Sequence, residues 1–397
     1  MDPSVALLFS IIFILVALRV KKNVTLAIIL GAFLLGFLTL GKTTFTLFLD
    51  TLTSFETLRL LIIIISAFTL GFSMQELGLL KRLCECVEAL FGKFSLILLP
   101  ALVGLLPMPG GALVSAVMIK DLVDKQGLSP EKATFLNYWC RHLWIPIWPL
   151  FPSFVLAASI VEVHYLKVIL ANYLITLFMI FISVTFLRSF FSFKGKRKFS
   201  FSYLRDFLTS FYPIIVVIVF SLVLHIKLVF VLPSVVVVLM LHKKPSLTRL
   251  KKIFSKTLDP EILILVVGVL FYKNLIIASH SATLFFYHLK SMHIPPAIAS
   301  FILAFIIGIA VGIEVGFAAI VLPLLAEFTG FAGSFHPLNF MLVFGGGFMG
   351  IMMSPLHLCL VLTAKYYNAN LNKVYKSLAP AVLLVCLLLW AVFVIKS

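Results

Sequence analysis

Three ionisable side chains lie inside stretches of sequence that are otherwise apolar. Arg141 and His142 are neighbours in Asn-Tyr-Trp-Cys-Arg-His-Leu-Trp (137–144), and Glu314 lies in Gly-Ile-Glu-Val-Gly (312–316). An ionisable group at membrane depth is costly and usually faces a partner or a functional cavity. A guanidinium offers a planar fork of donors to a carboxylate, and a buried carboxylate needs a partner, a proton or a cation. The sequence therefore predicts an anion-binding Arg141 and an ion-coupling Glu314.

Each of these side chains also has a purely structural interpretation. Arg141 can pair with an acid elsewhere in the bundle or lie over a Trp ring. Glu314 can form a fixed salt bridge, for which Arg141 itself is one partner. His142 serves equally well as a structural hydrogen-bond donor or as a proton carrier. The sequence leaves these alternatives open.

Other polar groups and glycines are placed to line the same site. Asn137, Arg141, Trp144 and Trp148 recur at helical spacing and share one face. Ser-Pro-Leu-His (354–357) stands at a corresponding position later in the chain, where His357 is either a site residue or an interhelical hydrogen bonder. The predicted substrate-binding residues are Met108, Gly110, Gly111, Asn137, Arg141, His142, Gly316, Ser354 and His357.

Proline and glycine interrupt the apolar segments that carry these residues. Pro-Met-Pro-Gly-Gly (107–111) divides one apolar segment into two short arms. Proline removes a backbone donor and glycine accepts positive φ, so the chain can reverse there, and arms of about 10–12 residues reach only the membrane midplane. The sequence predicts re-entrant hairpins at about 94–120 and 295–327, and broken helices at about 133–160 and 338–364.

An internal repeat organises these elements. At an offset of 206 residues, Gly110-Gly111 lies on Gly316-Phe317, Pro149 on Pro355 and Lys167 on Lys373. Repeats of this kind are common in secondary transporters. The predicted fold is an all-α polytopic membrane protein with two inverted repeats, each of five transmembrane helices plus a re-entrant helical hairpin. The predicted boundaries are 1–188 for the first repeat, 189–208 for a basic cytoplasmic linker, and 209–397 for the second repeat.

Composition and charge agree with a membrane protein. Of the 397 residues, 62% are hydrophobic and 12% are charged, whereas a soluble domain carries about a quarter charged residues. With the N-terminus outside and both hairpins re-entrant, and with Arg19 and Arg141 left out as intramembrane or borderline, 23 Lys and Arg fall inside and 7 outside, which follows the positive-inside rule. The net charge of +17 is thereby explained without a nucleic-acid partner. The five cysteines show no metal-ligand spacing and are interpreted as buried apolar residues.

Motifs for other kinds of chemistry are absent. The chain has no phosphate-binding GxxxxGK[ST] loop, no HExxH and no GxSxG, which argues against a primary pump and most enzymes. We expect no enzyme activity and no cofactor beyond a coupling proton or sodium ion. The predicted function is secondary transport of a small organic anion. A sodium/proton antiporter and a non-transporting membrane protein remain alternatives.

The motifs at 107–112, 137–142, 312–314 and 354–357 resemble an uncharacterised prokaryotic branch, domain of unknown function 401, of the ion transporter superfamily. That superfamily includes dicarboxylate, citrate, gluconate and lactate permeases. The resemblance implies a homodimer in the inner membrane, with early spans as scaffold, a moving transport domain of elevator type, and proton- or sodium-coupled uptake of organic anions. The sodium-coupled dicarboxylate members carry Ser-Asn-Thr at the hairpin tips, which this chain lacks, so their ion and substrate specificity do not transfer.

Overall fold

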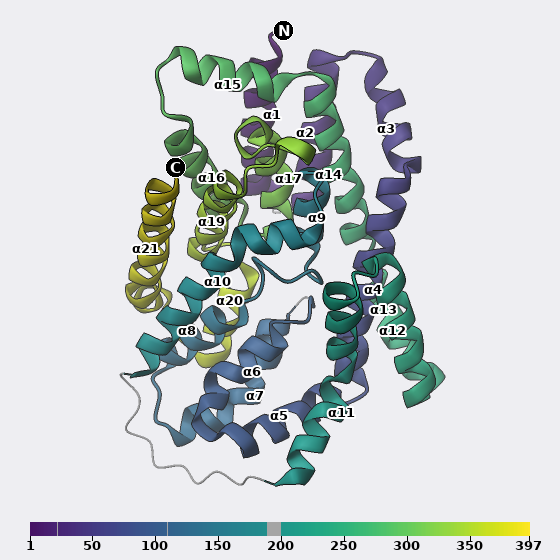
Figure 1. The fold of residues 1–397 in the computed structure, drawn as a ribbon, viewed down its shortest axis with the longest axis vertical. Helices are drawn as coiled ribbons and strands as arrows, with labels where there is room; N and C mark the ends of the chain where they lie inside the picture. Colours follow the sequence, from purple (N-terminus) through teal and green to yellow (C-terminus); the bar gives the residue numbers. More distant parts are fainter. Residues whose placement is uncertain (22, 109, 189–199) are drawn as a thin grey trace.

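The protein is a bundle of helices in a computed structural model that describes residues 1–397 except 22, 109 and 189–199 (Figure 1). The described residues contain no strand. The helices of the first half are α1 (Pro3–Lys21), α2 (Val24–Thr39), α3 (Thr43–Thr53), α4 (Phe55–Glu76), α5 (Leu79–Phe91), α6 (Ser95–Val103), α7 (Gly111–Lys125), α8 (Pro130–Arg141), α9 (Pro152–Ile160) and α10 (Tyr165–Arg188). Those of the second half are α11 (Phe201–Ile218), α12 (Leu228–Lys243), α13 (Leu247–Thr257), α14 (Pro260–Ala278), α15 (Ser281–Ser291), α16 (Pro296–Val311), α17 (Glu314–Leu324), α18 (Ala326–Thr329), α19 (Pro337–Met353), α20 (Leu358–Tyr367) and α21 (Leu371–Lys396).

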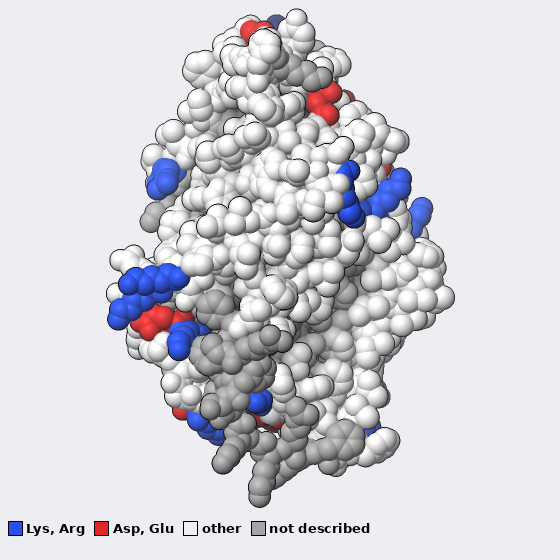
Figure 2. All heavy atoms as spheres, turned by 60° about the vertical axis from the view of Figure 1, so that its left-hand side comes forward, with Lys and Arg blue, Asp and Glu red and all other residues white. Residues whose placement is uncertain are grey.

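The apolar character of these helices makes this a multi-pass membrane protein. In the described part of the chain, eight helical segments are long and apolar enough to cross a membrane. Four shorter apolar helices accompany them, namely α2, α12, α16 and α17. On the face shown in Figure 2, charged side chains form small groups that are separated by a broad uncharged area. A surface of that kind suits contact with lipid hydrocarbon, where charge is excluded.

The structure also contains helices that the sequence pattern did not predict. α3, α5, α13 and α15 occupy stretches that we treated as connections between spans. α5 and α13 are amphipathic, with charged residues such as Arg82 and Lys252 on the exposed side and leucine or isoleucine on the buried side. Of the predicted linker, 189–199 lies outside the described residues, and 201–208 belongs to α11.

The helices follow one another in the same order in the two halves. α4 begins at Phe55 and α14 at Pro260, while α10 begins at Tyr165 and α21 at Leu371. Every helix from α1 to α10 has a counterpart between 201 and 396 in the same order, and α18 is an additional short helix. This order is compatible with a repeat at an offset of about 206 residues, and the inverted repeat stays a prediction.

Backbone chemistry explains where the helices break. α8 begins with Ser129 as its cap, whose hydroxyl accepts from the amide of Lys132 at 3.3 Å, and with Pro130 at its first position. It ends at Arg141, because Pro146 would clash with the carbonyl of residue 142 in a continuous helix. α16 ends at Gly312, whose φ of 67° is a left-handed conformation that favours glycine.

The broken segments of the two halves approach each other from opposite ends of the molecule. In Figure 1, α6 and α7 lie in the lower half, and α16 and α17 lie in the upper half. α20 packs against α7 and α8, and α17 packs against α9. The break in α19–α20, at 354–357, thereby lies near the end of α8. Chain breaks from distant parts of the sequence thus meet in the interior.

Glycine allows close contact between helices α16 and α19. A Cβ on Gly308 of α16 would lie 2.2 Å from the carbonyl oxygen of Gly347 in α19. A Cβ on Gly350 would lie 2.2 Å from the carbonyl oxygen of Phe305. The glycines of α19 therefore serve close helix packing, as small residues commonly do in membranes, and they fix the element that carries the break at 354–357.

Candidate functional site

One face of α8 and the loop after it contacts the segment between α6 and α7. Asn137 donates from Nδ2 to the carbonyl of Ala112 at 2.9 Å and to Thr363 Oγ1 at 3.1 Å. Trp148 donates from Nε1 to the carbonyl of Leu105 at 2.7 Å. Asn137 and Arg141 lie on α8 as their spacing predicts, but α8 ends at Arg141, so Trp144 and Trp148 lie in the turns after it and do not continue a helical face.

Arg141 is a buried cation with weak contacts and no acidic partner. Arg141 is 3% exposed to solvent. Nη1 lies 3.7 Å from the sulfur of Cys359, and Nη2 donates to the carbonyl of Met108 at 3.4 Å. Nε is buried without a hydrogen-bond partner. Among the described residues, no carboxylate lies within 4.0 Å of the guanidinium. The salt bridge to Glu314 that the sequence left open is therefore not formed.

The start of α7 comes close to this guanidinium because two glycines lead into the helix. A Cβ on Gly111 would lie 2.3 Å from Arg141 Nη2. Gly110 caps the helix with φ of 73°, and a Cβ added there would meet nothing within 4 Å. The N-terminal end of a helix carries a partial positive charge that attracts anions. The first turn of α7 and Arg141 therefore present positive charge to one small region.

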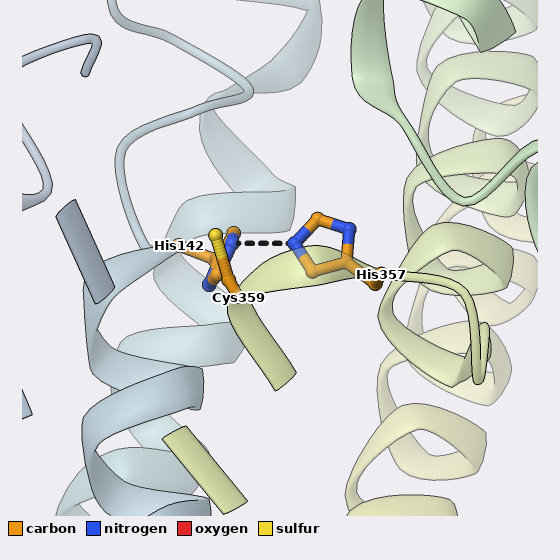
Figure 3. Close-up of side chains that lie close together, drawn as sticks. All are labelled: His142, His357 and Cys359. Carbon is orange, nitrogen blue, oxygen red and sulfur yellow. Dashed lines mark hydrogen bonds between the residues drawn. The ribbon is translucent and has the colours of Figure 1, made fainter. Parts of the chain in front are cut away.

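His142 and His357 face each other beside Arg141 (Figure 3). Their Nε2 atoms are 3.0 Å apart. His142 Nδ1 lies 2.5 Å from the carbonyl oxygen of Tyr138, and His357 Nδ1 lies 2.8 Å from the carbonyl oxygen of Gly312. A carbonyl oxygen only accepts, so each Nδ1 carries the hydrogen and donates it. In the neutral rings both Nε2 atoms then present lone pairs toward each other.

Glu314 lies next to this histidine pair rather than next to Arg141. Its Oε1 is 3.9 Å from Nε2 of His142 and 3.8 Å from Nε2 of His357. The carboxylate belongs to the first residue of α17, two positions after the left-handed Gly312. A carboxylate at this distance favours positive charge on the pair. Glu314, the predicted ion-coupling residue, therefore lies next to the histidine pair. Arg141, the predicted anion-binding residue, contacts Cys359 and Met108 instead.

The remaining predicted residues occupy different positions around this cluster. The Ser354 hydroxyl donates to the carbonyl of Ile309 at 2.6 Å, so it fixes the end of α16. The carbonyl of Met108 accepts from Arg141. A Cβ on Gly316 would meet the side chains of Val311 and Val24, so Gly316 lies in apolar surroundings away from the charged groups.

Several carbonyls of the broken segment after α8 accept hydrogen bonds. Thr176 of α10 donates to the carbonyl of Leu143 at 2.9 Å, and Asn172 donates to that of Pro146 at 3.0 Å. The amide of Phe151 donates to the carbonyl of Trp148 at 3.1 Å. Buried backbone acceptors are satisfied in this way at membrane depth, and α10 therefore holds the loop that follows Arg141.

Cys359 is a member of the cluster that sequence reasoning missed. The sulfur of Cys359 and one ring nitrogen each of His142 and His357 all lie within 4.8 Å of one another. Cys359 was interpreted as a buried apolar residue, because its partners His142 and Arg141 lie more than 200 positions away in the sequence. The only local signal is its spacing of two from His357, which is weak.

A second polar cluster joins α14 to α4 and to the end of α9. Lys273 is 3% exposed, and its Nζ lies 3.2 Å from Glu56 Oε1 and 3.5 Å from Glu162 Oε1. Glu56 accepts a short hydrogen bond from Ser159. We assigned Glu56 no role from the sequence; the signal for the cluster was Lys273, a lysine inside the apolar run of α14.

A cleft opens beside this second cluster, away from Arg141. Its volume is about 530 Å³, and it lies between α4, the end of α9 and the start of α12. Glu56, Glu162 and Arg59 contribute charged groups to its lining, together with His164. Arg141, His142 and His357 do not line it. In this conformation Arg141, His142 and His357 are buried.

The fold and the buried cluster define a class, a helical multi-pass membrane protein with ionisable groups at its chain breaks. The chain belongs to the family described as Protein of unknown function (DUF401), which matches residues 2–395. No curated protein matches the chain. The family therefore covers nearly the whole chain, as the motif resemblance implied.

Proposed function

We propose that this protein is a secondary transporter of a small organic anion, in which Arg141 binds the carboxylate of the substrate. The observation that carries the proposal is the guanidinium itself, which is buried, lacks an acidic partner and has an unpaired Nε. An uncompensated buried charge costs several kcal/mol. A carboxylate that accepts from the fork supplies the missing partner, and the start of α7 adds to the attraction.

The surrounding elements support alternating access. Arg141 is enclosed, so a solute reaches it only when the helices around the breaks move. The matching helix order of the two halves is what an inverted repeat needs, and the two pairs of short helices, α6–α7 and α16–α17, suit re-entrant hairpins. In our proposal these elements move together against a scaffold that includes α4 and α14. The family resemblance adds an elevator-type homodimer in a prokaryotic inner membrane.

Coupling to a proton or sodium gradient through Glu314 is the second part of the proposal. Its carboxylate is 20% exposed and lies at a hairpin-like tip, where backbone movement changes its surroundings. A cation bound there and an anion bound at Arg141 would share one enclosed region. The cation and the anion together would cross the membrane at a lower electrostatic cost than either ion alone.

Thermal unfolding of the purified protein with a panel of citrate, succinate, lactate and gluconate tests the proposal. A ligand that binds only the folded state raises the melting temperature. We expect at least one carboxylate to stabilise the wild type and none to stabilise Arg141→Gln. The unliganded variant should be at least as stable as the wild type, since a buried unpaired charge is removed.

Arg59→Gln is the matched control, because Arg59 is a cation that lines the cleft instead. It should respond to the carboxylate as the wild type does. Equal stabilisation of Arg141→Gln and wild type, or no response of the wild type to any carboxylate of the panel, would contradict the proposal.

A further inference from the structure

The two facing histidines carry an electrostatic requirement of their own. Both Nδ1 atoms donate to backbone carbonyls, those of Tyr138 and Gly312. Both Nε2 atoms therefore present lone pairs, at a separation of 3.0 Å. Two lone pairs at this distance repel each other unless a cation lies between them or one of the rings is protonated. The pair of His142 and His357 therefore requires one positive charge, either a cation between the two Nε2 atoms or a proton on one ring.

The neighbouring groups extend the pair into a set of metal ligands. The sulfur of Cys359 lies within 4.8 Å of a ring nitrogen of each histidine, and Glu314 Oε1 is 3.9 and 3.8 Å from the two Nε2 atoms. Imidazole, thiolate and carboxylate are the ligands that Zn²⁺ takes in proteins. Tetrahedral bonds of about 2.0–2.1 Å place two ligand nitrogens about 3.3 Å apart. The Nε2 atoms of His142 and His357, 3.0 Å apart, therefore need to move only slightly apart to reach this separation.

The outer contacts are those of metal-binding histidines. In such sites the other ring nitrogen commonly donates to a backbone carbonyl or a carboxylate, which fixes the tautomer and the ring plane. Tyr138 and Gly312 supply these carbonyls here, from α8 and from the end of α16. The rings are therefore held with their free nitrogens toward one point.

The charges of the cluster also accommodate a divalent ion. Arg141 Nη1 lies 3.7 Å from the sulfur of Cys359; it favours the thiolate and opposes a nearby cation. A dication that displaces the thiol proton adds one net positive charge to the cluster, the same as one proton on the histidine pair. Glu314 partly offsets that charge in both cases.

We propose that His142, His357 and Cys359 bind a transition-metal ion of the Zn²⁺ type, with Glu314 as a fourth ligand. The ligands come from the loop after α8, from the break before α20 together with the first turn of α20, and from the start of α17. A bound ion would join these three elements and hold the closed conformation. The inference concerns ion binding by the purified protein and does not depend on transport.

Titration of the full-length protein, purified without a polyhistidine tag, with Co²⁺ tests the site. Co²⁺ occupies zinc sites and reports its ligands by absorption. We expect one Co²⁺ per chain, visible d–d bands of tetrahedral strength, and a near-ultraviolet thiolate-to-cobalt charge-transfer band. Zn²⁺ should remove these bands and raise the melting temperature.

Two variants and two controls assign the ligands. Cys359→Ser should lose the charge-transfer band, and His357→Gln should weaken Co²⁺ binding at least tenfold. Cys386→Ser changes a buried cysteine on α21, and His164→Gln changes a histidine that lines the cleft. Both controls should keep the wild-type spectrum and affinity.

Three results would overturn the inference. They are the absence of stoichiometric Co²⁺ binding by the folded wild type, a charge-transfer band that persists in Cys359→Ser, and an equal loss of binding in the controls. If the folded wild type does not bind Co²⁺, a proton is left as the positive charge between the two histidine rings. Because Cys359→Ser is a small change of shape, it keeps the test decisive even if His357→Gln does not fold.

Discussion

Substitution of Gly111 by alanine should weaken anion binding without unfolding the protein. The added Cβ would lie 2.3 Å from Arg141 Nη2, 2.9 Å from Met108 Cγ and 3.1 Å from Arg141 Cζ. Carbon and nitrogen atoms in ordinary contact are about 3.5 Å apart, so the guanidinium must shift by about 1 Å. The atoms in the way belong to side chains, which can move, and alanine favours the helix by about 1 kcal/mol over glycine.

The expected loss of affinity follows from the geometry of the fork. A shift of this size removes one of two charge-assisted hydrogen bonds to a carboxylate, each of which is worth about 1.5–3 kcal/mol. The dissociation constant should therefore rise about 10- to 150-fold. Isothermal titration with the carboxylate that best stabilises the wild type measures this change.

Gly110→Ala is the matched control for the neighbouring position. Gly110 has φ of 73°, so alanine is strained there by about 1–2 kcal/mol, but its Cβ meets nothing within 4 Å. That variant should lose stability and keep its affinity. In an Arg141→Lys background, Gly111→Ala should add little further loss. Unchanged affinity in Gly111→Ala, or equal losses at Gly110 and Gly111, would refute the proposed place of the carboxylate.

Three further predictions address topology, stability and coupling. Cysteines at Lys81 and Lys125, which flank the predicted hairpin at 94–120, should react with an impermeant reagent from the same, cytoplasmic side; reaction from opposite sides would remove the hairpin and with it the inverted repeat. Glu56→Ala should lower the free energy of unfolding by about 3 kcal/mol, because Lys273 stays buried with only the more distant Glu162; an unchanged denaturation curve in detergent would contradict this. Glu314→Gln should still exchange substrate but fail to concentrate it against an imposed pH or sodium gradient; accumulation at the wild-type level would leave Glu314 a structural partner.

The sequence predicted the positions of the chain breaks because proline and glycine act locally. Pro146 has a fixed φ and no backbone donor, and Gly312 accepts a positive φ without steric cost. Helices α5 and α13 were not predicted, since their charged faces resemble those of loops in a scan for apolar spans. Their buried faces are recognised only against the helices that cover them, such as α11 and α4.

The candidate site was predicted in part. Arg141, His142 and Glu314 stood out because ionisable groups are rare in apolar segments. Their partners did not, since the pairing of His142 with His357 joins residues 215 positions apart. The same holds for Lys273 and Glu56, which are 217 positions apart. Distances of this kind are set by tertiary packing, which a single sequence does not contain.

Uptake of a radiolabelled carboxylate into proteoliposomes tests the central proposal most directly. The carboxylate is the one that stabilises the wild type, and Arg141→Lys is measured beside it, because lysine keeps the charge but loses the planar fork. We predict saturable counterflow by the wild type and an apparent affinity at least tenfold weaker for the folded Lys variant. Equal uptake by the two proteins, or uptake by the wild type no faster than by empty liposomes, would contradict anion transport through Arg141.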